Sequence, residues 1–91
     1  MKFRFGKQSY ANDRRKLNRL LKRNGIDFSW STIYDGYQWH FPSQPQGDAV
    51  IHQYSYGSKY GHFETMGCDW DNGDVTELTA QELIDRLLPR E

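Results

Sequence analysis

The sequence predicts an α+β fold: an antiparallel β-meander of four to six strands with two helices packed on one face, in β-α-β-β-β-β-α order. Three observations predict this fold. Apolar residues recur at helical spacing near the N-terminus, aromatic and polar residues alternate through the middle, and a helix-capping sequence stands near the C-terminus. A length of 91 residues leaves room for one hydrophobic core, so we expect residues 1–91 to form a single domain.

A short strand and a helix are predicted in the first quarter of the chain. Residues 2–5 alternate between basic and aromatic side chains, as a strand does when one of its faces is buried. A helix follows, begun by a cap at Ser9 or Asn12 and continued to Asn24. At 100° per residue its inward-facing residues form one stripe: Tyr10, Leu17, Leu20, Leu21 and Asn24.

Three helix ends carry clear local signals. Gly25 suits the left-handed position just after the first helix, and Ile26 follows it as a Schellman ending prefers. For the C-terminal helix, Thr79 and Glu82 have the spacing of a capping box, and Pro89 stops the helix. These signals predict where the first helix ends and where the C-terminal helix begins and ends.

The middle of the chain predicts a run of antiparallel strands. Residues 28–33 and 37–41 alternate in polarity, and Asp35-Gly36 between them is a favourable pair for a type I′ turn. Residues 42–47 contain two prolines and predict a loop. A second hairpin and a last short strand follow at residues 49–56, 62–68 and 74–78.

Charge is divided unevenly along a chain whose net charge is zero. Residues 1–25 carry nine Lys/Arg and one acid, a net charge of +8, and residues 26–91 carry three Lys/Arg and eleven acids, a net charge of −8. The helical cations opposite the apolar stripe are Arg15, Lys16, Arg19, Lys22 and Arg23. Such a face can bind phosphates or an acidic partner protein; the alternatives are a solvated face or one neutralised by the protein's own acids.

Aromatic residues supply a second candidate surface. The aromatic residues of the first hairpin are predicted to share one sheet face, mostly in the core: Phe28, Trp30, Tyr34, Tyr37, Trp39 and Phe41. Beyond them, a predicted aromatic and acidic surface comprises Tyr54, Tyr56, Tyr60, Trp70, Asp69, Asp71 and Asp74. Exposed tyrosine and tryptophan are typical anchors for a protein interface or a stacked base. Carboxylates beside them can imitate a phosphate backbone.

No motif indicates a metal, a cofactor or an enzyme, so the sequence predicts none of them. The three histidines and Cys68 lack the spacing of a zinc site. The run from Asp69 to Asp74 lacks the sixth-position glycine and the twelfth-position glutamate of an EF-hand. The enzyme alternative is a small nuclease built on histidine and acidic residues, and the one triad-like set on a shared strand face is His62, Glu64 and Cys68.

Composition sets the expected location. The first residues include no apolar core of a signal peptide, and no stretch approaches the roughly 20 apolar residues that span a bilayer. Cys68 is the one cysteine, so no intrachain disulfide can form. We therefore expect a cytoplasmic protein that does not contact a membrane.

These features together favour a small, non-catalytic binding protein that acts stoichiometrically on a partner protein, including one within a nucleoprotein complex. A short, polar, aromatic-rich chain of this kind fits an accessory protein of a phage or other mobile element. One concrete hypothesis is an inhibitor of a host defence nuclease that works as anti-CRISPR proteins do. The alternative is a nucleic-acid-binding regulator that uses the cationic face of the first helix.

Overall fold

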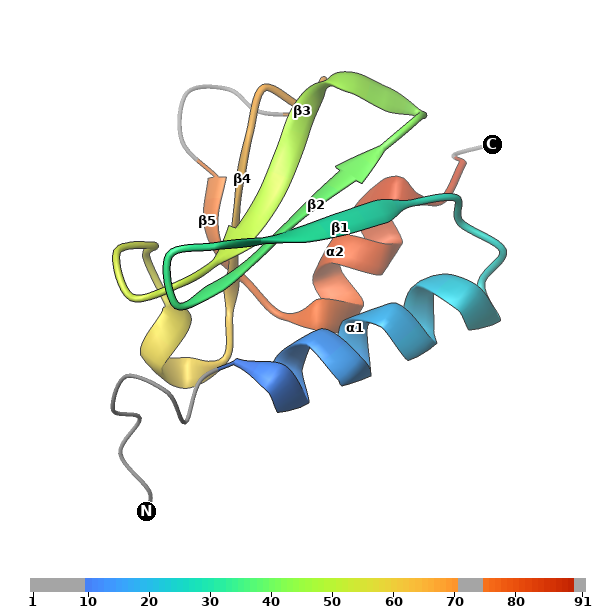
Figure 1. The fold of residues 1–91 in the computed structure, drawn as a ribbon. Coiled ribbons are helices and arrows are strands. Elements are labelled where there is room, and N and C mark those ends of the chain that lie inside the picture. Colours follow the sequence, from blue (N-terminus) through green and yellow to red (C-terminus); the bar gives the residue numbers. More distant parts are fainter. Residues whose placement is uncertain (1–9, 71–74, 90–91) are drawn as a thin grey trace.

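Five strands form one antiparallel sheet in which every strand pairs with its neighbour along the chain (Figure 1). The computed structural model describes residues 10–70 and 75–89. Within these ranges the elements are α1 (Ala11–Arg23), β1 (Ser29–Ile33), β2 (Gly36–Phe41), β3 (Gln44–Ile51), the short 3₁₀ helix η2 (Ser58–Tyr60), β4 (Phe63–Met66), β5 (Val75–Leu78) and α2 (Ala80–Leu87). The predicted α+β meander is confirmed, and the strand predicted at residues 2–5 lies outside the described residues.

Both helices cover the same face of the sheet, as predicted (Figure 1). Trp39 stands opposite Trp30 on one side and Ala49 on the other, and Ala49 stands opposite Thr65, so these four side chains share one face. Trp39 and Ala49 are fully buried on that face. The core between sheet and helices contains Tyr10, Leu17, Leu21, Trp39, Phe41, Ala49, Ile51, Phe63, Leu78, Ala80, Leu83, Ile84 and Leu87.

Mainly polar residues occupy the opposite face of the sheet. The strand registers place two rows there: Ser29, His40, Asp48 and Met66, then Ser31, Gln38, Val50 and Glu64. Gln38 Nε2 donates a hydrogen bond to Asp48 Oδ2 (2.7 Å). The carboxylates of Asp48 and Glu64 therefore lie on one side of the sheet while α1, with its cations, lies on the other.

The local signals at the end of α1 and at the start of α2 are confirmed. The predicted cap at Ser9 or Asn12 is wrong, because α1 begins at Ala11 with Tyr10 at the N-cap position and no side-chain cap hydrogen bond. Gly25 has a φ of 67°, and the N–H groups of Gly25 and Ile26 donate to the Lys22 and Leu21 carbonyls, which is the Schellman pattern. At α2, Thr79 and Glu82 form the complete capping box. The hydrogen bond from the backbone N–H of Thr79 lowers the pKa of the Glu82 carboxyl. None of the described helices is long and apolar enough to cross a membrane.

The turn between β1 and β2 differs from the prediction by one residue. Ile33 pairs with Gly36, so Tyr34 and Asp35 form the turn, and the positive φ of 54° falls on Tyr34. Gly36 instead begins β2 and is buried. A Cβ atom at Gly36 would lie 1.8 Å from the Ile51 carbonyl oxygen. The prediction of an Asp-Gly turn is wrong because the close approach of β3, rather than the turn, requires the glycine.

Strand β3 begins and ends earlier than the sequence indicates. The loop prediction for residues 42–47 is wrong from Gln44 onward, where β3 starts. A register shift after His40 leaves Pro45 without a pairing partner in β2, and proline is tolerated at such an irregularity because it has no N–H to donate. At its other end β3 stops at Ile51, and the chain then forms a hydrogen-bonded connection to β4.

Candidate functional site

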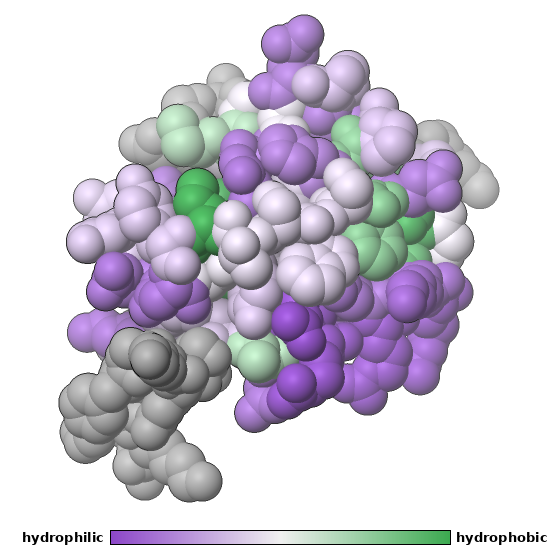
Figure 2. Space-filling model, in the orientation of Figure 1, coloured by the Kyte–Doolittle hydropathy of each residue, from purple (hydrophilic) through white to green (hydrophobic). Residues whose placement is uncertain are grey.

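The five predicted cations of the first helix are all exposed on α1, and we call this surface the basic face: Arg15, Lys16, Arg19, Lys22 and Arg23. Figure 2 shows hydrophilic side chains gathered over the part of the view that α1 occupies. Within residues 10–70 and 75–89, none of the five cations forms an ion pair, and the one hydrogen bond among them joins Arg15 to Asn12. The described acids therefore leave these charges available to a partner.

A groove of about 460 Å³ lies between α1 and the edge strand β1. We call it the α1–β1 groove, and its lining residues are Arg14, Arg15, Asn18, Arg19, Lys22 and Trp30. Three cations of the basic face line it, whereas Lys16 and Arg23 do not. The basic face therefore contains two groups of cations, those that line the groove and those that do not. The sequence alone could not distinguish these two groups.

Trp30 forms the aromatic wall of the α1–β1 groove, and ring–ring and cation–π contacts hold it in place. Trp30 exposes 42% of its surface, and its ring meets the Tyr37 ring edge to face with 5.6 Å between centroids. The Arg14 guanidinium lies 4.9 Å from the centroids of both rings, and its Nη1 donates to the Tyr37 hydroxyl (3.2 Å). Cation–π contacts of this kind fix both the arginine and the rings.

A partly buried hydrogen bond fixes Asn18, which lines the same groove. Trp39 Nε1 donates to Asn18 Oδ1 (2.7 Å). Because an indole N–H can only donate, the Asn18 amide must turn its oxygen to Trp39 and keep its NH₂ group for another acceptor. Sequence reasoning missed Asn18 and Arg14. A usable signal existed, since both side chains flank the apolar stripe rather than lying opposite it.

Four tyrosines gather at the end of the sheet where the β1–β2 turn and the β3–β4 connection lie (Figure 1). We call this the tyrosine surface: Tyr34, Tyr54, Tyr56 and Tyr60. Each of them exposes between 61% and 69% of its surface. The Tyr34 and Tyr54 rings meet edge to face with 5.0 Å between centroids. Tyr34 therefore belongs with the tyrosines of the connection and not with the core aromatics of the first hairpin.

Hydrogen bonds of Asp35 and of the buried residues His52 and Ser55 anchor the segments that carry the tyrosine surface. The Asp35 carboxylate accepts the backbone N–H of Gln53 (2.8 Å), which ties the turn to the connection. His52 Nδ1 accepts a hydrogen bond from the backbone N–H of Tyr54 (3.1 Å). The buried Ser55 hydroxyl accepts from the backbone N–H of His52 and donates to its carbonyl oxygen. The exposed rings are thus mounted on a fixed scaffold, a property typical of rigid binding loops.

The structure does not bring the predicted aromatic and acidic surface together. The tyrosines precede β4, whereas Asp69 and Trp70 follow it at the other end of the sheet (Figure 1). Trp70 is half-buried against the core, and its Nε1 donates to Thr65 Oγ1 (3.4 Å). Asp71 and Asp74 lie outside the described residues.

The histidines are also spread apart. His40 lies on the uncovered face, His52 supports the tyrosine surface, and His62 precedes β4. Among the described residues, no three His, Cys, Asp or Glu side chains are placed to hold a metal ion. Cys68 is buried, and its Sγ lies 4.0 Å from the Asp48 carbonyl oxygen.

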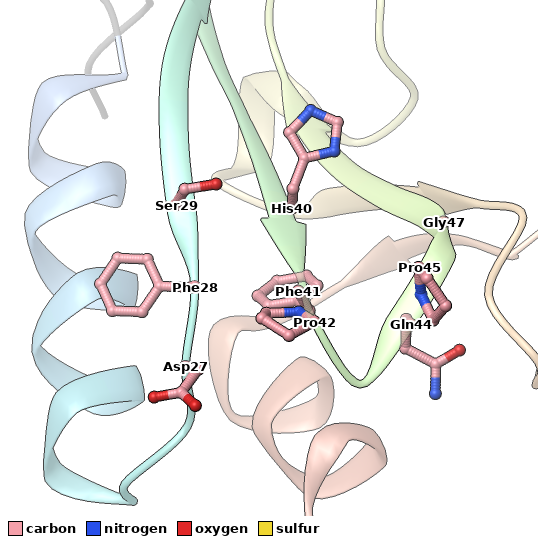
Figure 3. Close-up of a pocket in the computed structure, with 9 residues that line it drawn as sticks. All are labelled: Asp27, Phe28, Ser29, His40, Phe41, Pro42, Gln44, Pro45 and Gly47. Carbon is pink, nitrogen blue, oxygen red and sulfur yellow. The ribbon is translucent and has the colours of Figure 1, made fainter.

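A second hollow, of about 450 Å³, opens beside the irregularity in β2 and β3 (Figure 3). Phe28, Phe41 and two prolines form the apolar part of its lining, and polar residues such as Asp27 and His40 form the rest. Figure 3 shows the Asp27 and His40 side chains at opposite ends of this hollow, so they do not act as an acid–base pair.

Burial makes the effect of His52 on folding stability depend on pH. Burial lowers the pKa of His52 below the ordinary value of 6.5, and the carboxylates of Asp35 and Glu64 oppose the shift only in part. The unfolded chain therefore binds the proton more readily than the folded one. Folding stability should be fully present above about pH 6.5 and fall as the pH drops through the window below it.

The expected result is a free energy of unfolding that declines between pH 6.5 and pH 5 in the native protein and declines less in His52→Gln. Urea unfolding at several pH values measures it. Gln53→Ala, which changes the exposed neighbouring side chain and removes no titratable group, is the control and should keep the native pH dependence. Equal slopes for the native protein and His52→Gln would contradict the role of His52.

No protein-family model, curated protein or solved structure matches this chain.

Proposed function

We propose that this protein acts without catalysis, by binding a partner protein stoichiometrically, and that the tyrosine surface makes the contact. The observation that carries the proposal is the exposed, edge-to-face pair of Tyr34 and Tyr54 on a hydrogen-bonded scaffold. Tyrosine contributes large contact area with few rotatable bonds, and rings already fixed before binding lose little entropy when they are buried.

The backbone at Tyr34 supports this proposal. A φ of 54° is unfavourable for an aromatic residue and costs about 1–3 kcal/mol. Glycine would adopt the same conformation without strain. A strained residue whose ring remains 69% exposed does little for the core, so its ring is better explained by contact with a partner.

The acids on the uncovered sheet face narrow the partner class. Asp48 and Glu64 lie on the side away from α1, and their carboxylates attract a positively charged surface. A nuclease or other nucleic-acid-handling protein has such a surface where it binds phosphates. We therefore extend the proposal to inhibition of a nuclease of a defence system, with the tyrosine surface as the anchor.

A pulldown from host extract followed by calorimetry with the recovered partner tests the proposal. The native protein should bind at 1:1 stoichiometry, and Tyr34→Ser/Tyr54→Ser should lose at least about 30-fold in affinity, since interface tyrosines often contribute 2 kcal/mol or more. Trp30→Ser is the matched control, because Trp30 is an exposed aromatic residue (42%) on the helix-covered face, outside both the tyrosine surface and the acidic face. Equal loss in both variants, or recovery of nothing but the protein itself, would overturn the proposal.

Tyr34→Gly separates binding from folding. This variant removes the ring and relieves the strain, so the free energy of unfolding should hold or rise by up to about 1 kcal/mol. Partner affinity should nevertheless fall. A variant that is destabilised and still binds with native affinity would show that Tyr34 serves the fold alone.

A further inference from the structure

We propose that the α1–β1 groove is a second binding site, specific for single-stranded nucleic acid, in which the helix cations hold phosphates and Trp30 stacks on one base. This site is separate from the tyrosine surface. It uses residues of α1 and β1 that the proposed protein interface does not use.

The phosphate side of the site is a row of cations along α1. Arg15, Arg19 and Lys22 line the groove, are exposed, and recur at intervals of four and three residues, which places them along one edge of the helix. At a rise of 1.5 Å per residue the row extends about 10 Å, enough to follow a stretch of backbone rather than to hold one isolated anion. Arginine also binds phosphate oxygens through two parallel N–H groups.

The base side of the site is the exposed Trp30 ring. The Arg14 guanidinium, which also lines the groove, lies over the Trp30 ring, and the Tyr37 ring meets Trp30 edge to face, so the Trp30 ring is held in position before a ligand arrives. Base–aromatic stacking then adds affinity with little dependence on sequence. The NH₂ group of Asn18, whose oxygen is fixed by Trp39, adds a donor in the same groove for a base edge or a phosphate.

The pairing of cations with an exposed ring favours a single strand over the other polyanions. Bases in a duplex stack on one another and do not offer a free face to Trp30. An acidic peptide would use the cations but has no base for the ring. The volume of about 460 Å³ lies in the range of small-molecule sites and accommodates one unstacked base with its sugar.

Fluorescence anisotropy with labelled 12-mers tests the ligand class. The probes are oligo-dT, oligo-rU, a mixed-sequence DNA duplex and an oligo-glutamate peptide, each at 50 and 200 mM NaCl. The single strands should bind at least tenfold more tightly than the duplex and the peptide, and the two single strands show whether the sugar matters. Three phosphate contacts predict a loss of roughly 20-fold between the two salt concentrations. Equal or tighter binding of the duplex or the peptide would overturn the proposal.

Paired variants of equal charge test the location of the site. Arg19→Glu/Lys22→Glu changes the groove, whereas Lys16→Glu/Arg23→Glu makes the same charge change on the same helix outside it. The first pair should lose at least tenfold more affinity for oligo-dT than the second. Equal losses would mean that only the general charge of α1 matters, and the groove would be rejected.

Substitutions of Trp30 test the stacking. Trp30→Ala should lose about tenfold in affinity for oligo-dT, while Trp30→Phe should retain most of it, because phenylalanine keeps an aromatic face. Thermal unfolding of both variants verifies that the fold is intact. Native affinity in folded Trp30→Ala would overturn the stacking role. Tyr34→Ser/Tyr54→Ser should bind oligo-dT normally, so this site and the proposed protein interface can fail independently.

Discussion

Replacing Gly36 with alanine is expected to lower the free energy of unfolding by about 3 kcal/mol or more, a large share of the stability of a domain this small. The added Cβ atom would lie 1.8 Å from the Ile51 carbonyl oxygen and 2.8 Å from His52 Cα. Both obstacles are backbone atoms, so no side chain can rotate to relieve the clash. The start of β2 would have to move away from the end of β3. Urea unfolding monitored by circular dichroism measures the change.

Gly25→Ala is the matched control for this prediction. Gly25 has a φ of 67°, but a Cβ atom placed there meets nothing within 4 Å. The strain of a left-handed alanine alone should cost about 1 kcal/mol. A Gly36→Ala variant as stable as Gly25→Ala would mean that the two strands do not approach as closely as described.

Replacing Trp39 with alanine is expected to lower the free energy of unfolding by about 3–5 kcal/mol, a large share of the stability of a domain this small. Trp39 is fully buried at the centre of the helix-covered face, where its ring meets the Phe63 ring edge to face with 5.4 Å between centroids. Its truncation leaves a cavity and also removes the donor for Asn18. Thermal and urea unfolding measure the loss.

Two further substitutions separate the effect of the cavity from the effect of the lost hydrogen bond to Asn18. Trp39→Phe keeps most of the ring and removes the hydrogen bond to Asn18, so it should cost only about 1–2 kcal/mol. Trp30→Ala removes the same side chain at the sheet edge, where 42% of it is already exposed and no closed cavity can form, and should cost roughly 1–2 kcal/mol. A loss at Trp30 equal to that at Trp39 would contradict the assignment of Trp39 to the core centre.

The parts of the fold that were predictable depend on residues close in sequence. The capping box joins Thr79 to Glu82, and the Schellman ending joins Gly25 and Ile26 to the turn before them. Side-chain and backbone chemistry over three to five residues decides such features, whatever the rest of the chain does. The exposed basic face was predictable for the same reason, because it follows from the helical period of α1 alone.

The parts that sequence could not predict depend on strand register. Asp35-Gly36 matches the statistics of a hairpin turn, but the approach of β3 to Gly36 moves the turn to Tyr34. That shift takes Tyr34 out of the core aromatics and places it against Tyr54. Predicting the α1–β1 groove likewise requires knowing which strand lies at the edge of the sheet beside α1. Trp30 could be assigned to a sheet face from its alternation, but not to a groove wall.

The meander also has a consequence for how the chain folds. Each strand pairs with its immediate neighbour in the chain, so the sheet can assemble one hairpin at a time with short loops to close. The contact of α1 with α2 is different, since it joins the two ends of the described chain. We expect the sheet to organise early and the helix layer to complete the core late. The α1–β1 groove, which needs both layers, would then exist only in the fully folded protein.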